Sequence, residues 1–193
     1  MLYGRPDEPN ANGAEALAAA PTLLGDSPQF GPGGAPLCLA IAPTRELAMQ
    51  VAAELQWLYA DSGAKIATCV GGMDASKERR SLSHGAHIVV GTPGRLGDHM
   101  RRGNLDLSAL KVVVLDEADE MLDLGFFPDV ERIFALTPAR SQTMLFSATM
   151  PNDVVALAKR FLQQPTHIRA EHIDEGAVVN RIAQYVYRAH AMD

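Results

Sequence analysis

Five short apolar runs recur along the chain, and turn-prone polar residues follow each of them. They are LCLAIAP at 37–43, KIATCV at 65–70, HIVVGTP at 87–93, KVVVLDE at 111–117 and TMLFSAT at 143–149. Runs of this length without polar alternation are typical of strands buried on both faces, and the segments between them have helical spacing. The alternation predicts an α/β fold, with a parallel sheet flanked by helices.

Three of the segments between the runs carry helix signals. Thr44, Thr92 and Pro151 each stand at the start of a helical pattern, and Pro93 occupies the first helical position, where proline is favoured. Gly103 stands where the second of these helices is expected to end. The first helix is expected to face the sheet with the apolar stripe Leu47, Val51, Leu55 and Leu58.

Composition and charge restrict the classes of protein to consider. The chain has 193 residues, of which 47% are hydrophobic, enough to bury one core. Its two cysteines, Cys38 and Cys69, lie in strand-like runs, which favours a reducing, cytoplasmic location over a disulfide framework. No apolar stretch approaches the ~20 residues of a membrane helix, so no membrane association is expected. The net charge of -6 argues against a protein that holds nucleic acid mainly by a broad cationic surface, so any nucleic-acid contact must be local.

An acidic cluster follows the fourth apolar run, in the segment VVVLDEADEML. Asp116, Glu117 and Asp119 stand at the carboxyl end of the expected strand, and ligands of open α/β sheets bind at this end. A carboxylate there can hold Mg²⁺, usually through waters, while its neighbour orients a water for attack on a phosphoryl group. The competing interpretation is structural, because acids also favour the positive amino terminus of a helix.

Five motifs occur in order, each at or just after the end of one apolar run. They read PTRELA at 43–48, GG at 71–72, TPGR at 92–95, DEAD at 116–119 and SAT at 147–149. Alone, PTREL and TPGR would indicate only capped helix starts. Together, from about residue 37 to residue 165, the motifs resemble the first RecA-like (helicase ATP-binding) domain of a DEAD-box ATP-dependent RNA helicase.

The resemblance implies a RecA-like sheet of the P-loop NTPase type and a role for each motif. Asp116 and Glu117 would be catalytic, and Asp116 would also position Mg²⁺, through water. Asp119, Ser147 and Thr149 would couple ATP hydrolysis to RNA unwinding. The residues implied in RNA binding are Pro43, Thr44, Arg45, Gly71, Gly72, Thr92, Gly94 and Arg95. The implied ligands are ATP, Mg²⁺ and the RNA backbone, without preference for base sequence.

The sequence departs from this family before residue 43. It lacks the glutamine-containing motif that recognises adenine, and no Gly-Lys dipeptide occurs, so the phosphate loop ending in Gly-Lys-Thr is missing. We expect ATP to bind only if that loop is supplied, and the 193-residue chain to show no RNA-stimulated ATPase activity. Because the strand before the loop lies inside RecA-like sheets, the sheet is expected to be incomplete at the N-terminus.

The domain organisation follows from these departures. We expect a poorly ordered leader with one helix at 1–36, a partial RecA-like domain at 37–170, and a linker entering the missing second domain at 171–193. The leading hypothesis is a truncated helicase, and the alternative is a catalytically dead RNA-binding or partner-binding module. A different P-loop ATPase is a third hypothesis, which PTREL together with TPGR disfavours. A Gly-Lys-Thr loop in frame before Met1 would favour the first, and a genuine start at Met1 the second.

Overall fold

The computed structural model describes residues 29–137, 142–162 and 164–168. All five expected strands form within these ranges, each four residues long. They are β1 (Cys38–Ile41), β2 (Ile66–Cys69), β3 (Ile88–Gly91), β4 (Val112–Leu115) and β5 (Gln142–Leu145). The strand prediction from continuous apolar runs is therefore confirmed.

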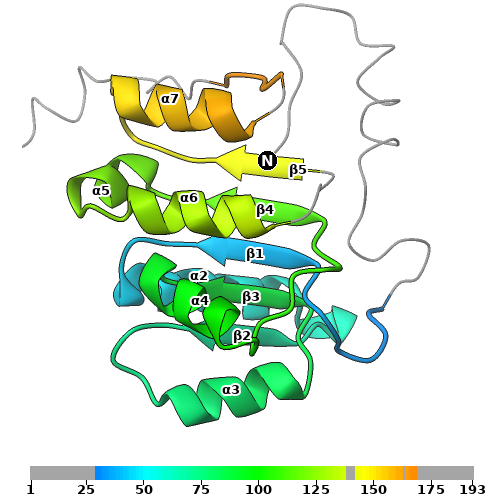
Figure 1. The fold of residues 1–193 in the computed structure, drawn as a ribbon. Coiled ribbons are helices and arrows are strands. Elements are labelled where there is room, and N and C mark those ends of the chain that lie inside the picture. The colour runs from blue at the N-terminus through cyan, green and yellow to red at the C-terminus, as the bar shows by residue number, and fades with distance from the viewer. Residues whose placement is uncertain (1–28, 138–141, 163, 169–193) are drawn as a thin grey trace, which may run out of the picture. The chain divides into compact units, whose positions relative to one another are not determined.

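The five strands form one parallel sheet in the order β2-β3-β1-β4-β5, and their arrows point the same way in Figure 1. The register brings the strand ends level with one another. Ile41 of β1 pairs with Gly91 of β3 and with Leu115 of β4, and Leu115 also pairs with Leu145 of β5. Every motif that follows a strand consequently leaves the sheet at the same carboxyl edge.

Helices cover both faces of the sheet (Figure 1). On one face lies α2 (Arg45–Leu58), and on the other lie α4 (Pro93–Arg101), α5 (Ala118–Asp123), α6 (Phe127–Leu136) and α7 (Asn152–Phe161). The helix α3 (Ala75–Ser83) contacts β2, and a 3₁₀ turn, Ala60–Ser62, follows α2. Strand side chains alternate between the two cores: Leu39 and Ile41 pack toward α4–α7, whereas Cys38 and Ala40 pack toward α2.

The face that α2 presents to the sheet agrees with the expected stripe except at its last position. Three members of the stripe are partly buried and pack against the core, namely Leu47, Val51 and Leu55, whereas Leu58 is 63% exposed. The fully buried residues of this helix, Ala48 and Ala52, were not part of the stripe. Alanine has no side chain beyond Cβ, so the helix axis can approach the strands closely along that line.

The described strands follow one another without an interruption in their pairing. The strand that was expected to be missing from the interior therefore leaves no gap among the five described strands. Among them β5 forms one edge of the sheet, and its residues are only half-buried. The helix expected before residue 29 and the linker expected at 171–193 lie outside the described residues. No helix in the described ranges is both long and apolar enough to cross a membrane.

Candidate active site and nucleic-acid interface

Three loops meet at the carboxyl ends of the neighbouring strands β2, β3 and β1. The Gly71 amide donates to the Thr92 hydroxyl at 3.4 Å, which connects the loop after β2 to the loop after β3. The Arg95 guanidinium donates to the Met73 carbonyl at 3.0 Å. A Cβ added at Gly72 would lie 3.3 Å from the Arg45 guanidinium, so that side chain rests against the loop after β2. The PTREL, GG and TPGR motifs are therefore in direct contact.

Most of the residues implied in RNA binding are accessible at this edge. Arg45, Gly71, Gly72 and Gly94 are exposed, and Thr44, Thr92 and Arg95 are half-buried. Pro43 is buried, so its side chain has no access to a ligand. Its assignment to RNA binding can apply only to its effect on the backbone that leads into α2.

The two threonines that begin α2 and α4 behave differently. Thr44 accepts a hydrogen bond from the Leu47 amide at 3.2 Å, as expected of an N-cap. Thr92 occupies the N-cap position of α4, and Pro93 follows it, but the Thr92 side chain makes no cap hydrogen bond. Its hydroxyl accepts from Gly71 instead. The prediction that Thr92 is the N-cap residue of α4 is confirmed, but the expectation that its hydroxyl caps the helix is wrong.

The acidic motif occupies the turn between β4 and α5. The Asp116 carboxylate accepts a hydrogen bond from the Glu117 amide at 3.0 Å, and Glu117 has left-handed backbone angles, φ 48° and ψ 57°. Such angles cost of order 1 kcal/mol for a residue other than glycine, so they are kept only where the surroundings hold them. The holding contact is at the next residue, where buried Ala118 donates its amide to the Phe146 carbonyl at 3.0 Å. The exposed Glu117 carboxylate is left free to meet a ligand.

Asp119 connects the acidic motif to the SAT motif. Its carboxylate accepts from both the amide and the hydroxyl of Thr149, each at 2.8 Å. Its own amide donates to the Ser147 hydroxyl at 3.1 Å, and that hydroxyl donates to the Thr149 carbonyl at 2.7 Å. Burial alone would raise the pKa of Asp119, but the hydrogen bonds from Thr149 and Ser147 outweigh it and lower the pKa to about 2.

This network predicts an acid-dependent loss of stability. A carboxylate with a lowered pKa stabilises the fold fully above its ordinary value of 3.8, and this contribution is lost as the pH falls toward about 2. We expect wild type to be more stable than Asp119→Asn at pH 7 and the difference to shrink between about pH 4 and pH 2. Urea unfolding of both proteins across this range measures the difference. A pH-independent difference would contradict the assigned hydrogen bonds.

Comparisons with known proteins identify the family. The DEAD/DEAH box helicase family model matches residues 16–157. The chain belongs to the DEAD/DEAH box helicase family. It is 44% identical over 152 residues to the DEAD-box ATP-dependent RNA helicase CshA of Bacillus licheniformis, covering 79% of this chain and 31% of that protein. It is 50% identical over 144 residues to the ATP-dependent RNA helicase DeaD of Haemophilus influenzae, covering 74% of this chain and 23% of that protein.

A solved structure gives the same result. A DEAD box protein from the hyperthermophile Methanococcus jannaschii superposes with a TM-score of 0.64 at 44% identity, over 66% of this chain and 35% of that one. The chain therefore spans roughly a third or less of the relatives it matches. The five-stranded parallel sheet with its flanking helices is the RecA-like domain that the motifs predicted.

The acids of this DEAD-box domain suit Mg²⁺ only as part of a larger site. No group of three or more His, Cys, Asp or Glu side chains within the described ranges could hold a metal. Mg²⁺ usually keeps several waters and takes one or two carboxylates together with substrate phosphates, and a site with the single carboxylate of Asp116 is compatible with this pattern. The 193 residues contain no Gly-Lys dipeptide, and a Gly-Lys-Thr phosphate loop is therefore not among them.

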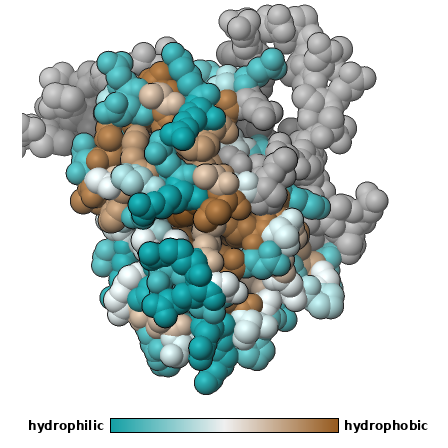
Figure 2. Space-filling model, viewed as in Figure 1, coloured by the Kyte–Doolittle hydropathy of each residue, from teal (hydrophilic) through white to brown (hydrophobic). Residues whose placement is uncertain are grey.

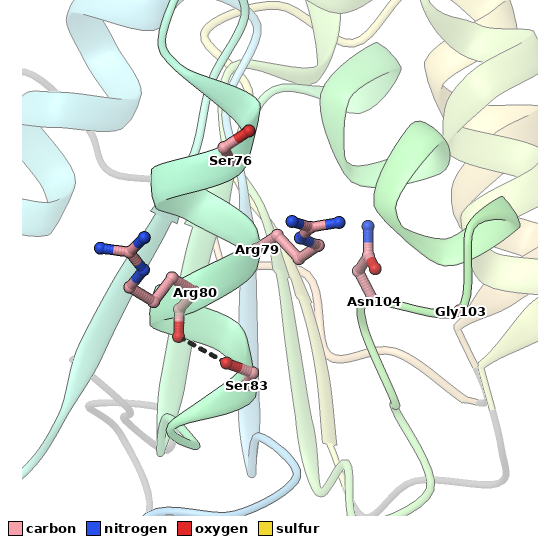
Figure 3. A pocket seen from close by; sticks show the side chains of 6 residues that line it. All are labelled: Ser76, Arg79, Arg80, Ser83, Gly103 and Asn104. Carbon is pink, nitrogen blue, oxygen red and sulfur yellow. Dashed lines mark hydrogen bonds between the residues drawn. The ribbon is translucent and has the colours of Figure 1, made fainter.

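A separate hollow of about 480 Å³ lies between α3 and the turn after α4 (Figure 3). Arg79 points across it toward Asn104, whereas Arg80 extends to the other side of α3. Its lining residues are Ser76, Arg79, Arg80, Ser83, Gly103 and Asn104. None of them belongs to the five motifs, so this hollow is distinct from the DEAD-box site.

Sequence reasoning missed two polar residues behind the loops that the motifs implied in RNA binding. Glu78 and His99 are 6% and 1% exposed, and their side chains lie 2.8 Å apart. Glu78 sits in the charged run SKERR, where an inward-facing acid cannot be told from its solvated neighbours. The one sequence feature related to its burial is its position, one helical turn after Asp74, the residue that caps α3.

Proposed function

We propose that this domain supplies the hydrolytic acids and part of the RNA-binding surface of an ATP-dependent RNA helicase. The observation that carries the proposal is the convergence of five motif loops at one sheet edge, where direct hydrogen bonds join the GG loop to the TPGR loop and the DEAD motif to the SAT loop. Loops after β1, β2 and β3 carry the RNA contacts, and loops after β4 and β5 carry the chemistry and its coupling.

The proposed chemistry uses two acids with separate tasks. Asp116 holds Mg²⁺, which when bound neutralises the phosphate charge that develops during hydrolysis. Glu117 orients the attacking water and accepts its proton, for which its exposed carboxylate at the end of β4 is suited. The left-handed backbone at Glu117 and the hydrogen bond from its amide to the Asp116 carboxylate fix the turn that carries both side chains. ATP binding itself requires a phosphate loop in addition to these residues.

Coupling between hydrolysis and RNA unwinding is assigned to Asp119, Ser147 and Thr149. The Asp119 carboxylate and the two hydroxyls form one connected set of hydrogen bonds between α5 and the loop after β5. A shift of the acidic motif during hydrolysis must therefore shift the SAT loop as well. Coupling requires, in addition, that this linked element has two arrangements and that both sites bias the equilibrium between them.

RNA is proposed to bind through its sugar-phosphate backbone, independently of base sequence. The supporting groups are the exposed turn at Gly71 and Gly72, the amino terminus of α4 at Gly94, and the guanidinium groups of Arg45 and Arg95. Amides, helix amino termini and arginines bind phosphates and carry little information about bases. Affinity is consequently expected to fall steeply with salt and to vary little among RNA sequences.

Gly94 offers a sharp test of this interface. A Cβ at Gly94 or at Gly97 would meet nothing within 4 Å inside the protein, and both residues lie in α4. Neither Gly94→Ala nor Gly97→Ala should destabilise the fold, because alanine is the better helix former. Gly94→Ala should nevertheless weaken RNA binding by about 1 kcal/mol or more, roughly fivefold in Kd, since the methyl blocks close approach of a phosphate.

The measurement is the Kd for labelled single-stranded RNA at fixed low salt, with thermal unfolding as the check on folding. Gly97→Ala is the matched control and should bind as wild type does. Equal affinities for all three proteins would remove Gly94 from the RNA interface.

The missing Gly-Lys dipeptide favours a second candidate, in which the 193 residues by themselves bind RNA without turnover. The test compares phosphate release by the 193-residue chain and by its Glu117→Gln variant, each in the presence of RNA. We expect equal release from the two proteins, which would mean that the 193 residues alone do not hydrolyse ATP.

A cytoplasmic location is proposed from Cys38 and Cys69, which are free and buried. Burial raises the pKa of each thiol to about 12, which makes both unreactive.

A further inference from the structure

Glu78 is the one buried residue of α3, a helix whose other residues are exposed apart from the half-buried Leu82. Its neighbours Lys77, Arg79 and Arg80 are exposed, whereas Glu78 is only 6% exposed. Figure 2 shows hydrophilic residues gathered over the α3 side of the molecule, in the lower part of the view. Burying a carboxylate is costly unless it is paired and hydrogen-bonded, so its partners must compensate for the lost solvation.

Both oxygens of the Glu78 carboxylate are engaged. Oε1 accepts a hydrogen bond from the Val70 amide at 2.9 Å. Oε2 lies 2.8 Å from His99 Nε2 and 3.6 Å from Arg95 Nε. These partners come from the loop after β2 and from α4, so one side chain of α3 connects two of the proposed RNA-binding loops.

The two connections hold opposite ends of the same short loop. Val70 is the residue before Gly71, and the Met73 amide donates back to the Val70 carbonyl at 3.4 Å across a turn in which Gly72 has φ 77°. At the other end, Arg95 donates to the Met73 carbonyl at 3.0 Å. Glu78 thus fixes Val70 directly and fixes Met73 through Arg95.

His99 completes the support behind this loop. It is 1% exposed, and with Nε2 donating to Glu78 its Nδ1 faces the Asn104 amide nitrogen at 3.4 Å. The carboxylate therefore has a fixed direction before any ligand arrives. Groups held in place in this way bind a ligand without a further ordering cost.

We propose that Glu78 is a positioning residue for RNA binding, which holds the Gly71-Gly72 turn and the Arg95 guanidinium in place for the RNA backbone. The proposal rests on the proposed function, because it needs these loops to contact RNA. Glu78 itself touches no RNA, since its carboxylate is buried and both of its oxygens are occupied.

The direction in which Glu78→Gln changes the affinity for RNA distinguishes a positioning role from a purely electrostatic effect of its charge. Glu78→Gln and the control Glu54→Gln, at an exposed acid on α2, each remove one negative charge. Electrostatics alone would make both variants bind RNA more tightly. Positioning predicts the opposite for Glu78→Gln, because glutamine can still accept from Val70 but presents no charged partner to Arg95. We expect its Kd for labelled single-stranded oligouridylate to rise by about threefold to tenfold.

Arg95 supplies the reference and a second test. Arg95→Ala should raise the Kd and reduce the slope of log Kd against log salt by about one phosphate contact. Arg95→Lys keeps the charge but lacks the fork that reaches Glu78 and Met73 together, so it should also bind more weakly than wild type. Because Arg95 is half-buried at the surface, this variant decides the matter even if Glu78→Gln proves unstable on heating.

The outcomes distinguish the two levels of the proposal. Weaker binding by Glu78→Gln and Arg95→Lys, with Glu54→Gln unchanged or tighter, supports positioning. Wild-type or tighter RNA binding by Glu78→Gln overturns the positioning role, and Arg95→Lys decides in the same way if Glu78→Gln does not fold. In either case, weaker binding by Arg95→Ala still supports the RNA interface itself. An unchanged Arg95→Ala removes Arg95 from the interface and overturns both.

Discussion

Glu117→Gln is expected to lower the rate of ATP hydrolysis by about 10²–10⁴-fold, the usual effect of losing a positioned general base. The appropriate protein joins this domain to a Gly-Lys-Thr phosphate loop and a second RecA-like domain, and is called the completed protein below. Glutamine keeps the shape of glutamate and the same left-handed backbone cost at this position. Binding of ATP and RNA should therefore persist while turnover is lost.

The control for this prediction is Glu120→Gln. Glu120 is an exposed acid in the first turn of α5, so it shares the helix-start environment of the motif but not its place beside Asp116. The Glu120→Gln substitution should change the rate of ATP hydrolysis only by the small effect of a less stable first turn of α5. Hydrolysis by Glu117→Gln within a few-fold of wild type would mean that the acidic motif only begins a helix.

Gly91→Ala is expected to cause the largest loss of stability among glycine substitutions at the site. A Cβ at this residue would lie 2.4 Å from the Cys69 carbonyl oxygen and 2.8 Å from two atoms of Leu96. The carbonyl belongs to the backbone of the neighbouring strand and cannot turn away. The overpacking should lower the free energy of unfolding by about 1–3 kcal/mol or more. The strained residue immediately precedes Thr92 in the chain.

Gly97→Ala is again the matched control, because its methyl would meet nothing within 4 Å and alanine should add about 0.5–1 kcal/mol of stability in a helix. Urea denaturation of the two variants and wild type measures both changes. If Gly91→Ala unfolds at the wild-type midpoint, β2 and β3 do not pack as closely as described.

The sheet could be predicted from sequence because its inner strands β1 and β3 are buried on both faces. Continuous apolar runs such as HIVVGTP have few alternative structures, and the turn residues after them mark where each strand ends. The common edge then follows from the parallel arrangement alone. The helical period also predicted Leu47, Val51 and Leu55 on the packed face of α2, but not the two fully buried alanines, because Ala48 and Ala52 carry almost no hydrophobic signal.

The motif residues were predictable, whereas their contacts to one another were not. The Thr92 hydroxyl had an equally good local partner in its own helix, and only the position of Gly71 decides between them. The burial of Glu78 depends on Val70, Arg95 and His99 meeting it from two other segments. Contacts over such sequence separations leave no periodic pattern along the chain.

RNA titration of ATP hydrolysis by the completed protein tests most directly whether one sheet edge carries two separate tasks. Arg45 rests against Gly72 in the proposed RNA interface, and Glu117 belongs to the hydrolytic acids. Arg45→Ala should raise the RNA concentration for half-maximal stimulation by roughly fivefold or more, as the loss of one phosphate contact requires, while the maximal rate stays near wild type. Glu117→Gln should abolish the rate at every RNA concentration. If Arg45→Ala instead lowers the maximal rate without shifting the half-saturating RNA concentration, the assignment of the loops after β1, β2 and β3 to RNA is wrong.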